Sequence, residues 1–124
     1  MAEEYSESIE MYLKTILALT NDSEQVHSVD VARKMDVSKP SVNRALRVLK
    51  DDGLINHERY GSITFTRKGR HLAEEVQGRY DTIVAFLVKT LKLDPVIAHR
   101  DACRMEHILS PETYEAIQGL ITEK

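Results

Sequence analysis

Apolar residues recur every three or four positions through most of this chain, and short polar turns separate the segments that carry them. This spacing is typical of amphipathic helices, because it aligns the apolar side chains along one face. A first helix is expected from about Ile9 to Thr20, where the polar residues Asn21-Asp22-Ser23 follow. The pattern therefore predicts a mainly α fold.

Two further short helices, joined by a brief turn, are expected next. Ser28 is a suitable N-cap for the first of them, which runs to about Met35. Ser38 and Pro40 indicate the start of the second helix, and Gly53 marks its end. Two short helices joined in this way predict a helix-turn-helix, whose second helix enters the major groove of DNA.

Two short strands are expected after this motif, from Leu54 to Glu58 and from Ser62 to Thr66, around the turn Tyr60-Gly61. A hairpin at this place predicts a wing. Thr66 is then expected to cap a long helix whose apolar stripe continues to Leu91. The predicted architecture is a winged helix-turn-helix DNA-binding domain over residues 1–70, followed by a helical dimerisation domain over residues 71–124.

The candidate DNA contacts are polar and basic side chains on the outward side of the second short helix and at the tip of the wing. They are Ser38, Lys39, Pro40, Ser41, Asn43, Arg44, Arg47 and Arg59. Residues 28–79 hold 11 Lys and Arg against 7 Asp and Glu, although the whole chain has a net charge of −3. A locally basic surface on an acidic protein suits phosphate contacts, but ordinary solvated side chains could produce the same balance.

The composition excludes several protein classes. The 42% hydrophobic content predicts a folded protein, and the longest apolar run is far shorter than the roughly 20 residues of a membrane span. The single cysteine permits no internal disulfide, and the N-terminus lacks the features of a secretory signal. A cytoplasmic protein without a membrane segment is expected. No oxyanion loop or substrate cleft is indicated, so no enzymatic activity is expected.

A second candidate site lies near the C-terminus, where Cys103, Glu106 and His107 occupy helical i, i+3 and i+4 positions. Sulfur, oxygen and nitrogen donors can therefore converge from one side of a helix on a transition metal. Each residue alone has another interpretation, since an isolated cysteine is commonly an inert buried thiol. A thiol that senses redox state through Cys103 is an alternative function, as is a winged-helix regulator that responds to no metal.

Several separate motifs follow one another in a distinctive order along the chain. They are Met11-Tyr12-Leu13, Val37-Ser38-Lys39-Pro40-Ser41-Val42, Gly53-Leu54, Tyr60-Gly61, Thr66-Arg67-Lys68-Gly69 and Ala102-Cys103-Arg104-Met105-Glu106-His107-Ile108-Leu109-Ser110. In this order they resemble the diphtheria toxin repressor family of metal-dependent transcriptional repressors. The resemblance covers essentially the whole chain and is that of a short form without the SH3-like third domain of longer members.

The resemblance implies a homodimer that binds a palindromic operator in double-stranded DNA, with Fe(II) or Mn(II) as corepressor. It also implies four metal ligands, which are Met11, Cys103, Glu106 and His107. Sulfur ligands suit Fe(II) better than Mn(II), although Co(II), Ni(II) and Zn(II) would also bind them in vitro. The expected function is therefore metal-dependent repression in metal homeostasis, with Fe(II) favoured.

The chain departs from the family at a second, ancillary metal site. The positions that hold a histidine and a glutamate in the family are Tyr80 and Val84 here, and only His99 of that site remains. A complete second site is therefore not expected. His99 is interpreted as a vestige of that site, either at the surface or hydrogen-bonded to another ligand.

Overall fold

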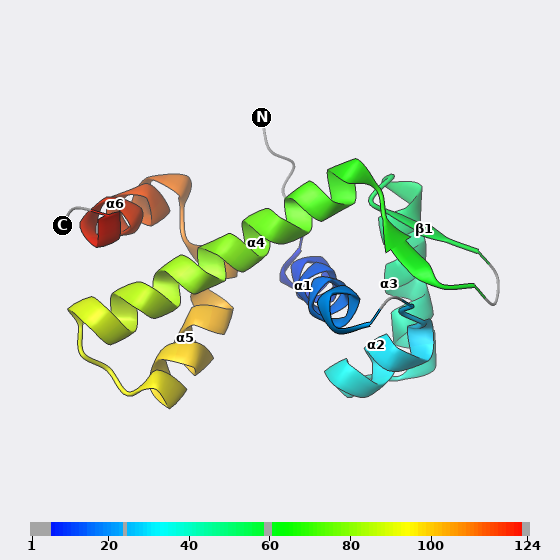
Figure 1. Cartoon of the computed structure of the whole chain (residues 1–124), viewed down its shortest axis with the longest axis horizontal. Coiled ribbons are helices and arrows are strands. Elements are labelled where there is room, and N and C mark those ends of the chain that lie inside the picture. The colour runs from blue at the N-terminus through cyan, green and yellow to red at the C-terminus, as the bar shows by residue number, and fades with distance from the viewer. Residues whose placement is uncertain (1–5, 24, 59–60, 123–124) are drawn as a thin grey trace. The chain divides into compact units, whose positions relative to one another are not determined.

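The computed structural model describes residues 6–23, 25–58 and 61–122, and helices dominate it (Figure 1). The elements in chain order are α1 (Glu7–Asp22), α2 (Ser28–Met35), α3 (Lys39–Asp51), β1 (Ile55–His57), β2 (Ile63–Phe65), α4 (Arg67–Ala85), η1 (Phe86–Thr90), α5 (Pro95–Ile108) and α6 (Pro111–Thr122). None of the helices in the described segments is long and apolar enough to cross a membrane. The predicted mainly α fold with a winged helix-turn-helix is confirmed.

The chain divides into two compact units, residues 1–74 and 75–124. The division falls inside α4, slightly after the position at which the sequence analysis separates the two domains. Each unit has its own cluster of buried apolar side chains.

The first unit is built around the apolar faces of α1 and α3. Leu13 and Ile16 of α1 are 0% exposed, and Leu46 and Leu49 of α3 are 2% and 0% exposed. These positions are the ones that helical spacing predicts for the buried faces. Burying a side chain of this size stabilises a fold by about 1.5–3 kcal/mol, so this cluster accounts for much of the stability of the unit.

The turn between α2 and α3 follows from two local features. Asp36 ends α2 in the left-handed conformation, with φ 55°, and the backbone N–H of Val37 donates to the carbonyl of Ala32 at 3.2 Å. Ser38 is the N-cap of α3, and its hydroxyl accepts from the backbone N–H of Ser41 at 3.3 Å. The predicted start of α3 is therefore confirmed.

The predicted N-cap of α2 is wrong by one residue. His27 is the N-cap, and Ser28 is the first helical residue. The reason is the carboxylate of Asp30, which accepts a hydrogen bond of 2.9 Å from the backbone N–H of His27. An acidic side chain that reaches back to the N-cap in this way satisfies one of the backbone donors that a helix start leaves without a helical partner.

The wing is an antiparallel pair in which Ile55, Asn56 and His57 of β1 face Phe65, Thr64 and Ile63 of β2, respectively. Both strands are shorter at each end than predicted. The backbone N–H of Ile63 also donates to the carbonyl of Val26 at 2.7 Å, which ties the hairpin to the segment before α2.

Gly69, in the first turn of α4, packs directly against the backbone that leads into the wing. A Cβ atom at this position would lie 1.7 Å from the carbonyl oxygen of Leu54. Nearby, the hydroxyl of Thr66 accepts from the backbone N–H of Gly69 at 3.0 Å, so Thr66 caps α4 as the sequence predicts. Only glycine permits this close approach between the helix and the strand.

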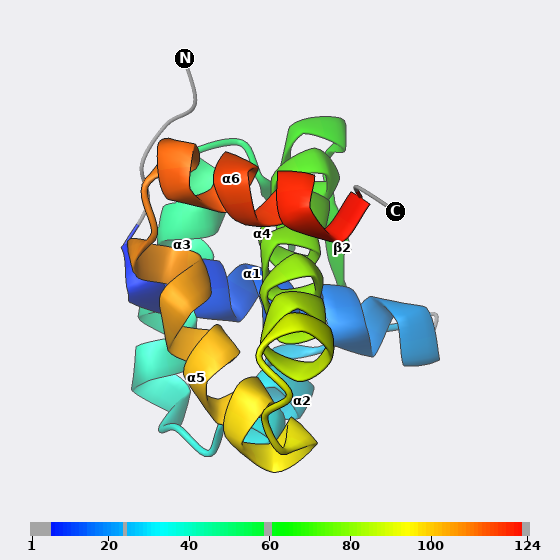
Figure 2. The ribbon, with the colours of Figure 1, turned by 90° about the vertical axis from the view of Figure 1, so that its left-hand side faces the viewer.

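The second unit contains the C-terminal part of α4, then η1, α5 and α6 (Figure 2). Both α5 and α6 contact η1. Its core contains Ile83, Leu87, Ala98 and Ala102. The sequence analysis predicts one long helix with an apolar stripe continuing to Leu91. That prediction is wrong at the end, because η1 is a π-helix and Leu91 is 50% exposed. The wider π turn takes Leu91 out of the apolar stripe.

Candidate metal centre and DNA-binding surface

The outward face of α3 displays the side chains predicted to contact DNA. Lys39, Pro40, Asn43, Arg44 and Arg47 are exposed, and Ser38 and Ser41 lie at the start of the helix. The opposite face is buried in the core of the first unit. A recognition helix requires this arrangement, because one face must pack in the core while the basic and polar face remains accessible to DNA. Arg59, the remaining predicted contact, lies outside the described residues.

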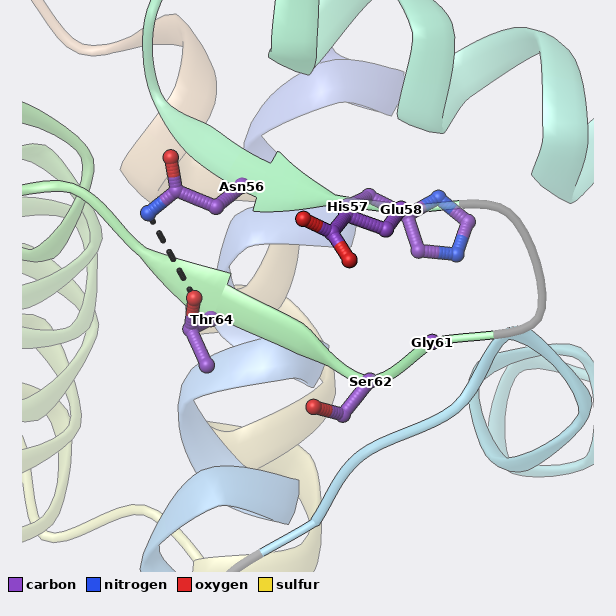
Figure 3. A pocket seen from close by; sticks show the side chains of 6 residues that line it. All are labelled: Asn56, His57, Glu58, Gly61, Ser62 and Thr64. Atoms are coloured by element: carbon purple, nitrogen blue, oxygen red, sulfur yellow. Dashed lines mark hydrogen bonds between the residues drawn. The ribbon is translucent and has the colours of Figure 1, made fainter.

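The wing carries a shallow polar pocket that the sequence analysis did not predict (Figure 3). It is lined by Asn56, His57, Glu58, Gly61, Ser62 and Thr64. Asn56 and Thr64 face each other across the two strands, and the Asn56 amide donates to the Thr64 hydroxyl at 3.4 Å. Its amide and hydroxyl groups suit contacts with the sugar and phosphate groups of DNA, whereas the carboxylate of Glu58 in the same lining repels phosphate.

Lys50 connects the recognition helix to the wing. Its Nζ atom donates to the backbone carbonyl of His57 at 3.0 Å. Burial lowers the pKa of His57 from its ordinary value of 6.5, and the charges of Lys50 and His27 lower it further. This tether was not predicted from the sequence, because the two residues belong to different elements.

Glu106 and His107 form the most buried polar pair of the candidate metal centre. The Glu106 Oε1 and His107 Nε2 atoms are 3.0 Å apart, and the two side chains are 0% and 1% exposed, respectively. Burying a carboxylate costs several kcal/mol unless a positive group or a metal compensates it. The donor types fit a divalent transition metal, since imidazole nitrogen and carboxylate oxygen both bind such ions.

Two local features position this pair. The carboxylate of Asp94 accepts from the backbone N–H of Val96 at 2.7 Å, and Pro95 occupies the first turn, so α5 begins where the sequence predicts. Further along α5, the Nε atom of Arg79 donates to the backbone carbonyl of Glu106 at 3.0 Å. Arg79 therefore holds α4 and α5 together at the level of the candidate ligands.

The thiol of Cys103 lies beside His99. Its Sγ atom is 3.8 Å from Nε2 and 4.0 Å from Nδ1 of His99. The hydroxyl of Tyr80 forms a hydrogen bond with Nδ1 of the same imidazole, and the two rings are T-shaped with centroids 5.5 Å apart. Burial raises the pKa of Tyr80, and the negative charges of Cys103, Asp81 and Glu106 raise it further.

The four predicted metal ligands come from both units of the chain. Met11 is a half-buried residue of α1 in the first unit, whereas Cys103, Glu106 and His107 belong to α5 in the second. Within the part of the chain that the structure describes, no three His, Cys, Asp or Glu side chains converge as a metal-binding group. The four-ligand set therefore stays a prediction. The resemblance assigns Tyr80 and His99 to one ancillary site, but their hydrogen bond was not predicted, because the residues are 19 positions apart and no local spacing relates them.

Two segments of the sequence match the models of two domains of one family. Residues 4–63 match "Iron dependent repressor, N-terminal DNA binding domain", and residues 66–123 match "Iron dependent repressor, metal binding and dimerisation domain". The first match contains α3 and the wing. The second contains Glu106, His107, Cys103 and Tyr80.

Individual relatives agree with these matches. The transcriptional regulator MntR of Escherichia coli O6:H1 is 36% identical over 118 residues, which cover 95% of this chain and 75% of MntR. The diphtheria toxin repressor of Corynebacterium glutamicum is 30% identical, and the match covers 86% of this chain and 46% of that protein. The structure of the manganese regulator SloR is similar, with a TM-score of 0.79 and 26% identity, over 100% of this chain and 56% of SloR. The chain thus spans about half the length of the last two proteins.

Proposed function

Because the chain belongs to the iron-dependent repressor family, we propose that it is a DNA-binding transcriptional repressor that metal ions activate. The observation that carries this proposal is the buried Glu106–His107 pair, which lies inside the segment that matches the metal-binding domain. A bound cation would add positive charge beside the buried carboxylate, and the energetic cost of burying that carboxylate would then serve a function.

The DNA-binding half of the proposal is supported by the exposed face of α3. Arg44 and Asn43 suit bidentate contacts to guanine and adenine, respectively, and the wing adds positioning contacts. We infer that the operator is a palindrome bound by a homodimer, because two-fold symmetric repressors read two half-sites about one helical turn apart.

The homodimer is supported by large apolar side chains in the second unit. Val96 and Ile108 of α5 are 75% and 72% exposed, and Leu120 of α6 is 56% exposed. Apolar area in contact with water costs about 25 cal/mol per Å², so covering these side chains with a second copy would stabilise the assembly.

For the metal, we infer that Fe(II) is the corepressor in preference to Mn(II). The ligands proposed are Cys103, Glu106 and His107, with Met11 as a further sulfur ligand. Manganese favours oxygen ligands, whereas a thiolate and a thioether suit Fe(II) better. The bound ion supplies positive charge to the carboxylate and the thiolate. Metal binding and operator binding then strengthen each other by the same factor.

The experiment that tests the proposal measures operator affinity under anaerobic conditions. A fluorescent duplex, selected from a random pool by the full chain with Fe(II), is titrated with protein in EDTA, in Fe(II) and in Mn(II). We expect tight binding with Fe(II), weaker binding with Mn(II) and the weakest binding in EDTA. Equal affinity in all three conditions contradicts the proposal, and tighter binding with Mn(II) contradicts only the choice of metal.

A further inference from the structure

Lys50 of α3 and His57 of β1 are joined by a hydrogen bond of 3.0 Å, from the Nζ atom of the lysine to the backbone carbonyl of the histidine. We propose that Lys50 is a positioning residue that holds the wing where the wing and the recognition helix contact DNA together. Its ammonium group then acts on operator binding through the wing and not by a direct contact. The inference rests on the proposed function and deepens it, because it assigns a role to a residue between the two DNA-binding elements.

Lys50 lies on the outward side of α3. Asn43, Arg47 and Lys50 occupy i, i+4 and i+7 positions and are all exposed, so they share one face of the helix. Spacing alone would make Lys50 a further phosphate contact. Its position in the last turn, however, brings the ammonium group to the wing, where it donates to a carbonyl. A hydrogen bond from a charged donor is stronger than one between neutral groups, so this contact favours the positioning role.

Contacts at its base, along β2 and at the end of β1 hold the wing in the first unit. At the base, the hydroxyl of Thr66 donates to the carbonyl of Gly53 at 2.6 Å. Along β2, the backbone N–H of Ile63 donates to the carbonyl of Val26 at 2.7 Å. These contacts join the wing to segments outside the recognition helix. The lysine at the end of β1 joins it to α3 itself, and therefore relates the position of the wing to that of the helix.

The orientation of the wing matters because the wing carries groups of opposite effect on phosphate. Asn56 and Thr64 present an amide and a hydroxyl at exposed positions, whereas the carboxylate of Glu58, one residue beyond His57, repels phosphate. Hydrogen bonds span about 2.7–3.2 Å, so a displacement of about 1 Å breaks them. Without the lysine tether, the wing should lose its contacts beside each half-site, while the contacts of α3 with bases remain.

The test compares Lys50→Met with the unsubstituted chain on two duplexes in Fe(II). The long duplex carries the half-sites with flanking base pairs, and the short duplex ends at the outer edges of the half-sites, where the wing has no phosphates to contact. K50M should bind the long duplex about three- to tenfold more weakly, which corresponds to one hydrogen bond, and the short duplex within about twofold of the unsubstituted chain. Equal losses on both duplexes, or no loss on the long one, overturn the inference.

Two further variants separate the hydrogen bond from the charge. Lys89→Met, at an exposed position of η1 in the second unit, removes the same charge without touching the wing. It should bind both duplexes as the unsubstituted chain does, and a loss equal to that of K50M overturns the inference. Lys50→Arg keeps a charged donor and should bind the long duplex within about twofold of the unsubstituted chain. A loss in K50R as large as that in K50M also overturns it.

Hydrogen exchange in the chain without DNA separates the inference from the proposed function. His57 faces Ile63 across the wing, and the backbone N–H of Ile63 is hydrogen-bonded to Val26. In K50M this N–H should exchange about three- to tenfold faster, because the wing opens more often, and unchanged exchange overturns the inference. Faster exchange in K50M, together with operator binding that is equal in EDTA and in Fe(II), contradicts the proposed function alone.

Discussion

The Nε atom of Arg79 donates a hydrogen bond of 3.0 Å to the backbone carbonyl of Glu106, and this contact joins α4 to α5 beside the candidate ligands. Replacing Arg79 with alanine should lower the affinity for Fe(II) by about tenfold, because partners that orient metal ligands contribute at this level. Isothermal titration under anaerobic conditions measures the affinity.

The control for this change is Arg100→Ala on α5, where the guanidinium side chain is 72% exposed. It removes the same charge without touching the carbonyl of Glu106. If both variants lose the same affinity, long-range charge and not the hydrogen bond explains the effect.

Glu106 is the only anionic oxygen donor of the proposed corepressor set. Glu106→Gln keeps the volume of the side chain but removes its charge, so Fe(II) affinity should fall by about 100-fold or more. Operator binding in Fe(II) should then approach the level measured in EDTA. Glu115→Gln, at an exposed position of α6, is the matched control, and its operator binding should still respond to Fe(II). An unchanged metal response in E106Q would remove Glu106 from the ligand set.

Gly69 is expected to be the glycine least tolerant of substitution. In Gly69→Ala the added Cβ meets the Leu54 carbonyl at 1.7 Å, so the helix or the strand must move, at a cost of about 3 kcal/mol or more. Urea unfolding followed by circular dichroism measures the change. Gly78→Ala lies in the same helix, and its Cβ would meet no atom within 4 Å apart from the chain neighbours and the backbone of the helix itself, so it should instead stabilise the protein by about 0.5–1 kcal/mol. Equal effects of the two substitutions would show that the close contact is unimportant.

His57 should make stability depend on pH. Its pKa in the folded protein lies below the ordinary value of 6.5, first because of burial and then because of the charges of Lys50 and His27. The unfolded chain therefore binds a proton more readily, and the free energy of unfolding should fall as the pH drops below about 6.5. Above about pH 6.5 His57 is neutral in both the folded and the unfolded chain, so its protonation no longer affects the free energy of unfolding. Urea titrations at several pH values should show a smaller decrease for His57→Gln, and identical pH profiles would exclude His57 as the cause.

Arg44 tests the assignment of α3 as the recognition helix. Arg44→Ala should weaken operator binding by about 1–3 kcal/mol if the guanidinium reads a base, with the largest loss for the preferred sequence. Fluorescence anisotropy on the selected duplex and on a scrambled duplex separates base readout from phosphate contact. An equal loss on both duplexes would identify Arg44 as a phosphate contact, and Arg100→Ala again controls for the lost charge.

Local signals predicted the starts of three helices well. Ser38, Thr66 and Asp94 are all N-caps or accept hydrogen bonds from the first turn, as their positions in the sequence indicate. The N-cap Ser28 was wrong because Asp30 reaches back to His27, and two adjacent polar residues compete for that role. A helix cap depends on residues that are close in the sequence, so the first residue of a helix can be predicted from the sequence to within about one position.

Contacts between distant residues were not predictable in the same way. Cys103, Glu106 and His107 were identified because they share one short segment. The Lys50–His57 tether joins separate elements, and the Tyr80–His99 proximity was implied only by the family resemblance. Spacing rules describe a single helix or strand and contain no information on which elements meet. The family resemblance supplied Met11 for the same reason, since nothing local associates it with α5.

The π-helical turn from Phe86 to Thr90 changes the direction in which successive side chains point at the end of α4. Each residue of an α-helix advances by about 100°, and a π turn accommodates one residue more than an α turn. The residues from Phe86 to Thr90 are therefore out of phase with an unbroken α-helix. A designer who transfers side chains from a straight helical template onto residues 86–90 must shift the register by one residue after Ala85.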